Sequence, residues 1–299
     1  MLKRSQKILS GVKGAPAAGL RLRLLGLSFL MLFVELALIR WTGSNILYLS
    51  YFSNFILLAS FLGIGLGFLR ANARRNLFPL APAGLLLLVA FVRLFPVQID
   101  RSGTELIFFG ALGVQSGLPP WITLPILFLG VAGVMMLIAE GVARTFRLFP
   151  PLDAYRLDIL GSIAGITAFS FLSFLGAPPL AWGAVVAVAM LLLLERRRRL
   201  WQAVPLAAIV LLLGIESLVP TDSWSPYYKI RLIHQASGAV TVLVNGIPHQ
   251  TMETAARRLQ TVPLYGLIYQ RISTSPKDVL IVGAGTGVDV AIALQHGVD

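Results

Sequence analysis

The sequence predicts a mainly α-helical protein: a polytopic membrane bundle of about seven spans, then a small β-hairpin module and the start of a Rossmann-like α/β domain. Three observations predict this class. Hydrophobic residues make up 57% of the 299 residues and charged residues only 13%, whereas ordinary soluble domains carry about 25% charged residues. Apolar stretches of spanning length recur up to residue 219. A glycine-rich loop stands between an aliphatic run and an apolar helix pattern near residue 285.

The chain divides into four segments. Residues 1–19 form a basic cytoplasmic leader, and residues 20–219 form the multi-span domain. Residues 220–276 form a hairpin and helix module, and residues 277–299 form a first βα unit. The apolar run after the leader has no small-x-small cleavage site behind it, so it predicts a retained first span rather than a signal peptide.

Seven apolar segments are candidate membrane spans, which makes the lipid bilayer the first expected partner. A spanning helix needs about 20 residues, and the sixth segment, bounded by Pro179 and Glu195, is short by that measure. An apolar piece at 106–112 is too short to cross, and it predicts a re-entrant or interfacial turn. The predicted spans are 24–39, 46–69, 77–95, 121–143, 159–175, 180–194 and 201–219.

Basic residues gather in alternate loops and predict a multi-pass cell-membrane protein with a cytoplasmic N-terminus. The formal charge of +12 therefore reflects topology and not a nucleic-acid partner. Seven spans place the chain after residue 219 on the far side. An eighth span within 97–120 would return it to the cytoplasm, so the side of the C-terminus stays open. The N-terminal side holds Arg70, Arg74, Arg75, Arg144, Arg147, Arg156 and Arg196 to Arg199, and the opposite side holds Arg40, Arg93 and Arg101.

Carboxylates inside the spans are candidate intramembrane polar residues. Such charges are costly, and they often line a pathway or pair with a cation. Glu35 lies deep in the first span with Arg40 near its end. This placement predicts a polar site or an ion pair in the bundle, with simple packing as the alternative. Glu140 and Glu216 lie near span ends, and we expect them to reach water.

Glycines recur at helical spacing within two spans. Gly63, Gly65 and Gly67 share the second span, and Gly161 and Gly165 form a GxxxG pattern in the fifth. Small residues let helix backbones approach closely. We therefore expect these spans to pack tightly against neighbours.

The segment after the last span changes to a soluble pattern. Residues 225–233 and 239–244 alternate as strands do, and Asn245-Gly246 is a tight-turn pair, so the two runs predict a β-hairpin. Residues 254–271 follow a helical pattern with a break near Pro263.

The glycine loop is the strongest candidate for a binding site. Residues 279–282 are all aliphatic and predict a strand buried in a parallel sheet. Glycines then alternate as GxGxG, the spacing usual in S-adenosylmethionine-type sites, and a helix pattern follows. Glycines let a ligand approach the backbone, and the helix start offers free N–H groups. A tight turn without ligand is the alternative. The candidate cofactor-binding residues are Gly283, Gly285, Thr286, Gly287 and Asp289.

Three motifs in this order resemble the spermidine synthase (polyamine aminopropyltransferase) family, in particular its membrane-fused branch. They are residues 225–230, 244–250 and 279–294. The resemblance implies transfer of an aminopropyl group from decarboxylated S-adenosylmethionine to a diamine. It implies that Tyr228 and Gln250 contact substrate and that the glycine loop holds the nucleoside.

The chain also departs from the family pattern. Thr286 stands where the family loop usually has an acid, and the family's catalytic aspartate and ribose-binding acid would fall beyond Asp299. We therefore expect a fragment that is inactive alone, or one that a partner chain completes. The alternatives are a transport or sensing protein that binds a polyamine or nucleoside without catalysis, and a plain membrane scaffold. The chain has no cysteine and three scattered histidines, so we expect no metal.

Overall fold

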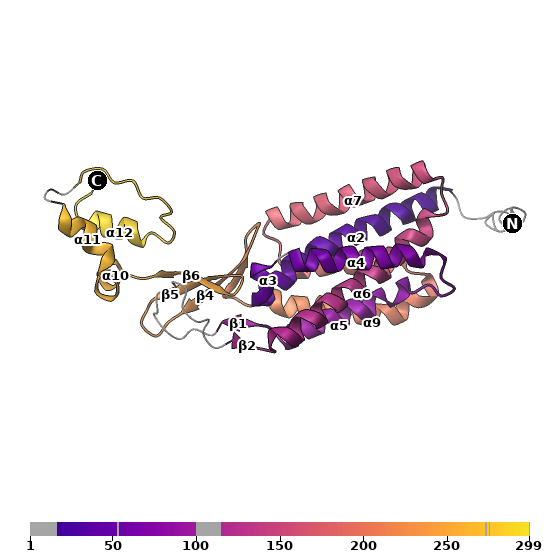
Figure 1. Ribbon diagram of the computed structural model, residues 1–299, viewed down its shortest axis with the longest axis horizontal. Coiled ribbons are helices and arrows are strands. Elements are labelled where there is room, and N and C mark those ends of the chain that lie inside the picture. The colour runs from indigo at the N-terminus through magenta and orange to yellow at the C-terminus, as the bar shows by residue number, and fades with distance from the viewer. Residues whose placement is uncertain (1–16, 53, 100–114, 273, 275, 299) are drawn as a thin grey trace, which may run out of the picture.

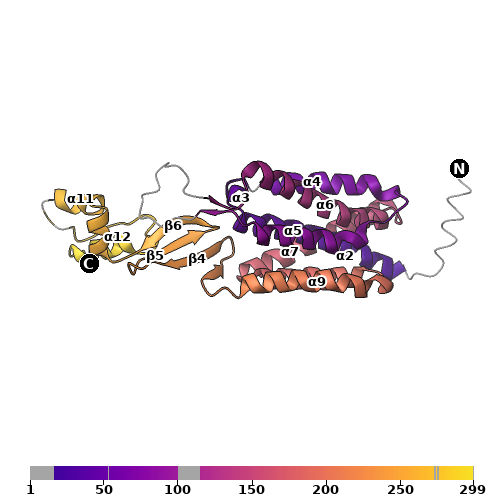
Figure 2. The same cartoon turned by 90° about the horizontal axis from the view of Figure 1, so that it is seen from below.

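The computed structural model describes the chain except residues 1–16, 53, 100–114, 273, 275 and 299. The molecule is elongated: a helical bundle, a small sheet and a C-terminal helical unit follow one another along its length (Figure 1). The view from below shows the same order, with the sheet between the bundle and the last three helices (Figure 2).

The bundle confirms a mainly helical protein with membrane-type helices. Among the described residues, five helices are long and apolar enough to cross a membrane, and two apolar helices, at 78–94 and 179–193, are shorter. Short helical pieces α3 (Leu47–Tyr51), η1 (Arg70–Asn72) and η2 (Phe78–Leu80) join or extend them. The main helices are α2 (Ala17–Asn45), α4 (Asn54–Leu69), α5 (Ala81–Leu94), α6 (Pro120–Phe146), α7 (Pro151–Phe174), α8 (Pro179–Leu193) and α9 (Arg196–Ser217).

Proline pairs set the start of three bundle helices. α6, α7 and α8 each begin at the second proline of a Pro-Pro pair, while the first proline is extended. Proline suits the first helical position because its missing N–H would have no partner there. The helix of the predicted fifth span, 159–175, therefore begins earlier, at Pro151.

Close helix packing at the glycine patterns is confirmed. A methyl group added at Gly161 or Gly165 would overlap the backbone of α2 at Leu25 or Phe29. Gly63 and Gly67 meet α6 in the same way, whereas Gly65 has open space. These contacts bring α7 onto α2, and α4 onto α6, backbone against backbone.

A four-stranded antiparallel meander caps one end of the bundle. It contains β3 (Asp222–Trp224), β4 (Lys229–His234), β5 (Val240–Val244) and β6 (Ile247–Met252), in chain order. The predicted hairpin is thus present and gains two further strands. Asn245 and Gly246 both have positive φ, of 50° and 79°, as a type I′ turn requires.

A two-stranded ribbon, β1 (Gln98–Ile99) with β2 (Gln115–Ser116), lies beside the meander. The backbone of Val97 bonds Asn45 and Leu47, which ties the end of α5 to the end of α2. The turn predicted at 106–112 lies outside the described residues.

The C-terminal unit contains α10 (Ala255–Thr261), α11 (Leu264–Arg271) and α12 (Val288–Gln295). The helix break predicted near Pro263 is confirmed. Ala255, Val288 and Ile292 form a small core of its own. The strand predicted at 279–282 is not formed, and Leu280 and Val282 are each 89% exposed. A strand needs a neighbour to satisfy its backbone groups, and no described strand lies beside this segment.

Candidate functional site

Gln250 and the glycine loop meet in the structure. A methyl group added at Gly285 would overlap the carboxamide of Gln250, so the side chain lies directly against the Gly285 backbone. The two residues come from different elements, the edge strand β6 and the loop before α12. This contact brings together two residues that the sequence predicted as substrate-binding and cofactor-binding.

A bulge in β6 helps to aim Gln250. Pro248 pairs with Leu243 and Gln250 with Val242, so His249 has no partner on β5. A bulge turns the side chains that follow it, and bulges are common next to binding sites. Pro248 is tolerated because β6 is an edge strand.

The loop backbone adopts conformations that favour glycine. Gly283, Gly285 and Gly287 have φ of 74°, 54° and 83°, and Gly287 is the N-cap of α12. The first N–H groups of a helix lack partners within the helix. The loop therefore presents backbone donors beside Gly285, which suits oxygen-rich or anionic ligand groups.

Thr286 and Asp289 are both half-buried. Thr286 lies in the loop and adds a neutral hydroxyl. Asp289 lies in the first turn of α12, where the helix dipole stabilises a carboxylate. The described residues contain no group of three His, Asp or Glu side chains placed to hold a metal. The local chemistry is therefore that of a loop of backbone and hydroxyl donors with one carboxylate, Asp289, beside it.

Tyr228 lies apart from this site. The strand register aligns Leu232, Val242 and Gln250 across the sheet. Tyr228 is four residues from that row along the chain, roughly 13 Å at the rise of an extended strand. Its side chain is 51% exposed at the bundle end of the sheet.

Glu35 and Arg40 do not form an ion pair in the described part of the chain. Glu35 is 4% exposed within α2, and its Oε1 has no hydrogen-bond partner there. Arg40 instead donates to the carbonyl of Ser225 and lies over the rings of Trp182 and Trp224, at 4.9 and 5.6 Å. Arg40 thus contacts the sheet, and Glu35 stays in the bundle.

A buried ionic network joins the sheet to the bundle. Lys229 of β4 donates to Glu216 of α9 at 2.6 Å and lies 3.2 Å from Asp222. Asp222 also accepts two hydrogen bonds from Arg231, at 2.6 and 2.7 Å. The second oxygen of Glu216 accepts from Trp41 at 2.7 Å. Lys229 and Asp222 were not predicted as functional residues, although Lys229 and Arg231 alternate on one face of a predicted strand.

The expectation that Glu140 and Glu216 reach water was wrong. Their exposed fractions are 0% and 1%. Glu140 is held by Arg70 at 3.1 Å and Arg144 at 2.7 Å, at the end of the bundle away from the sheet. Arg144 also donates to two carbonyls of the 70–78 loop. A buried charge must be paired. Each of these carboxylates is therefore held by basic side chains, and the pairs join its helix to a neighbouring segment.

Electrostatics favour the charged forms of Asp222 and Arg231. Burial alone would raise the pKa of Asp222, but the hydrogen bond from Arg231 and the charges of Lys229 and Arg231 outweigh burial and hold this pKa below its usual value. The hydrogen bond to Asp222 raises the pKa of Arg231. Both groups are therefore ionised at neutral pH.

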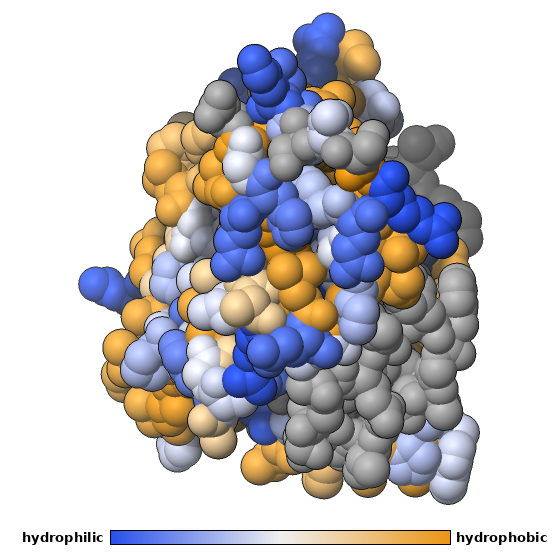
Figure 3. Space-filling view, turned by 90° about the vertical axis from the view of Figure 1, so that its left-hand side faces the viewer, coloured by the Kyte–Doolittle hydropathy of each residue, from blue (hydrophilic) through white to orange (hydrophobic). Residues whose placement is uncertain are grey.

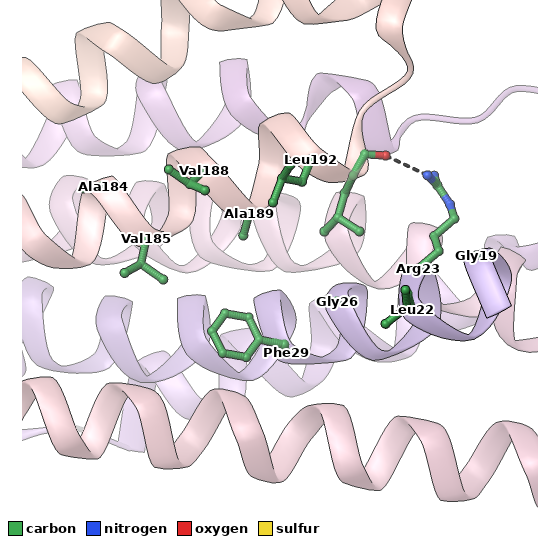
Figure 4. A pocket seen from close by; sticks show the side chains of 11 residues that line it. Gly19, Leu22, Arg23, Gly26, Phe29, Ala184, Val185, Val188, Ala189 and Leu192 are labelled. Atoms are coloured by element: carbon green, nitrogen blue, oxygen red, sulfur yellow. Dashed lines mark hydrogen bonds between the residues drawn. The ribbon is translucent and has the colours of Figure 1, made fainter.

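A groove of about 840 Å³ opens along the side of the bundle between α2 and α8 (Figure 4). Most residues that line it are apolar, and some of them, including Gly26, Ala184 and Ala189, are small. Among the described residues that line it, Arg23 at one end is the one charged side chain, and it donates to the Leu193 carbonyl at 2.7 Å. The groove offers little to recognise a polar ligand, and its chemistry matches lipid chains.

The end of the molecule that carries the C-terminal unit mixes hydrophilic and hydrophobic side chains (Figure 3). This mixed surface differs from the groove between α2 and α8, whose lining is mainly apolar. No family model, curated protein or solved structure matches the chain, so comparison with known proteins assigns no function to either surface.

Proposed function

We propose that this chain is a polytopic membrane protein that binds a nucleoside-type ligand beside the contact of Gln250 with the glycine loop, without transferring a group itself. The observation that carries the proposal is the contact of the Gln250 carboxamide with Gly285. A carboxamide offers both a donor and an acceptor, and the loop offers backbone N–H groups. Together they match the mixed donors and acceptors of a nucleoside.

Two features favour binding over catalysis. Thr286 is neutral where the spermidine synthase pattern has an acid, so it cannot hold the ammonium group of an adenosyl donor. The sheet and the 70–78 loop also lie at opposite ends of the bundle (Figure 1). With the basic loops cytoplasmic, the glycine loop faces away from the cytosol, where adenosyl cofactors are made. Transport or sensing of an external nucleoside or polyamine is consistent with a binding loop on the side away from the cytosol.

A partner chain is part of the proposal. Leu280 and Val282, which precede the loop, are each 89% exposed. Aliphatic side chains in such a run become buried when a neighbouring strand pairs with them. We propose that a sheet supplied by a partner covers this segment and holds the loop in its binding conformation.

The second candidate is a membrane-fused transferase of the spermidine synthase type. The order of the motifs around Tyr228, Gln250 and the glycine loop favours it. It requires the sheet end to be cytoplasmic and a carboxylate to take the proton from the attacking amine. Formation of spermidine from putrescine and decarboxylated S-adenosylmethionine would select this candidate.

The test is ligand binding by the full chain in phosphatidylcholine nanodiscs. Adenosine, S-adenosylmethionine, decarboxylated S-adenosylmethionine and spermidine are compared by equilibrium dialysis. We expect the adenosine-containing ligands to bind, and Gly285→Ala to weaken binding at least about fivefold, because its methyl group displaces Gln250 and a lost hydrogen bond to a ligand is worth about 1 kcal/mol or more.

Gly297→Ala is the matched control. Gly297 also has positive φ, of 76°, but an added methyl group would meet nothing within 4 Å. This variant carries the backbone strain without the overlap, so it should bind as the wild type does. The proposal fails if no adenosine-containing ligand binds, or if both variants lose binding equally.

A further inference from the structure

Unused hydrogen-bond donors gather at the junction of bundle and sheet, away from the glycine loop. Arg40 Nε and Nη1 and the indole nitrogens of Trp182 and Trp224 are buried and have no hydrogen-bond partner among the described residues. Native proteins rarely leave buried polar atoms unpaired, and each case calls for an explanation. Four such atoms in one place, all of them donors, indicate a missing acceptor.

The three side chains form one compact group. The rings of Trp182 and Trp224 meet edge to face with centroids 5.0 Å apart. The guanidinium of Arg40 lies 4.9 and 5.6 Å from the two centroids. Trp182 is 2% exposed, whereas Arg40 and Trp224 are half-buried. Water therefore reaches the edge of the group, while its donors lie inside.

The surrounding charge is positive. Lys229 lies 5.5 Å from the ring of Trp224 and links this group to the ionic network. Among the described residues of the junction, four cations (Arg40, Arg93, Lys229 and Arg231) meet two carboxylates, Glu216 and Asp222. The formal excess is two positive charges. A phosphate monoester carries about −1.5 to −2 at pH 7, and it has acceptor oxygens only.

We propose that Arg40, Trp182 and Trp224 form a binding site for a terminal or free phosphate group. Nε–H and Nη1–H of the guanidinium can each donate one charge-assisted hydrogen bond to a phosphate oxygen, and the two indoles add one donor each. Tryptophans at the end of a membrane bundle lie at headgroup level. The ligand is therefore free phosphate from solution or the headgroup of phosphatidic acid. This site does not depend on the nucleoside site.

The experiment uses the full chain in nanodiscs. In phosphatidylcholine discs, binding of radiolabelled inorganic phosphate is measured by equilibrium dialysis with chloride as competitor. In discs containing phosphatidic acid, retained lipid is measured by native mass spectrometry against phosphatidylcholine. Phosphate binding alone assigns a soluble ligand, and selective phosphatidate retention alone assigns a lipid. The proposal is overturned if the wild type shows neither.

Trp182→Phe and Trp224→Phe are the decisive variants because each keeps an aromatic ring and removes the N–H donor, together with part of the indole volume. We expect each to weaken binding about tenfold, as expected for one hydrogen bond to a charged group, and Arg40→Gln to abolish it. Arg23→Gln is the control, since Arg23 also donates to a backbone carbonyl but lies in the lipid-facing groove. Binding equal to wild type in both tryptophan variants would overturn the proposal even if Arg40→Gln fails to fold.

Discussion

At the residue scale, Glu216 commits its two oxygens to different elements. One oxygen accepts from Lys229 in the sheet and the other from Trp41 in the bundle. The carboxylate is 1% exposed, so water cannot replace either partner. Glu216 therefore links α9 to α2 and β4, and its loss should destabilise the junction of bundle and sheet.

Lys229→Met tests this role. Removing one partner of a buried pair typically costs about 3–5 kcal/mol, because the other charge remains buried. We expect a loss of that size in the free energy of unfolding measured in mixed micelles, and partial recovery in the double variant with Glu216→Gln. Arg257→Met, which removes a half-exposed partner of Glu253 while Arg258 still pairs with that carboxylate, should cost less than about 1 kcal/mol. Equal losses in the two single variants would contradict the account.

Asp222 makes the junction sensitive to acid. Its folded-state pKa lies below the unfolded value, so its stabilising contribution is present above about pH 4. That contribution is lost as the pH falls through the folded pKa. Protection of the β4 amides against hydrogen exchange, corrected for the intrinsic exchange rate at each pH, should therefore fall in acid. Asp222→Asn should lower this protection at neutral pH and make it depend less on pH. A variant profile that matches the wild type would exclude Asp222 as the titrating group.

At the element scale, backbone contact through glycine holds the helices together. Gly165→Ala should destabilise the bundle, because its methyl group would overlap the Phe29 carbonyl. Gly133→Ala is the control, since Gly133 has open space in α6. Alanine there should be neutral or stabilise by up to about 1 kcal/mol through helix propensity. Unfolding in mixed micelles measures both, and equal midpoints for the two variants would contradict the packing.

Local signals in the sequence predict most elements but not their docking. Apolar length predicts the helices, Asn245-Gly246 the hairpin and Pro263 the helix break, because each depends on nearby residues. The aliphatic run at 279–282 predicts a strand that does not form, because a strand depends on a neighbour. The pairing of Glu216 with Lys229 and the contact of Gln250 with Gly285 join elements through the tertiary fold, and no local spacing reveals them.

At the scale of the whole molecule, different ion pairs close the two ends of the bundle. Arg70, Arg144 and Glu140 close one end, and the sheet with its ionic network closes the other. The glycine loop lies beyond the sheet (Figure 1). The number of helices that cross the membrane therefore decides whether the glycine loop meets ligands of the cytosol or ligands of the far side.

The central claim is that the 70–78 loop and the sheet face opposite sides of the membrane. The chain has no cysteine, so single cysteines report position cleanly. Arg74→Cys marks the loop and Ser237→Cys marks the exposed β4–β5 turn. The account predicts that an impermeant maleimide labels the Ser237→Cys variant in intact cells, and the Arg74→Cys variant only after permeabilisation. Labelling of both variants in intact cells would contradict it. Protection of both until permeabilisation would also contradict it, and would return the sheet to the cytosol and favour the transferase.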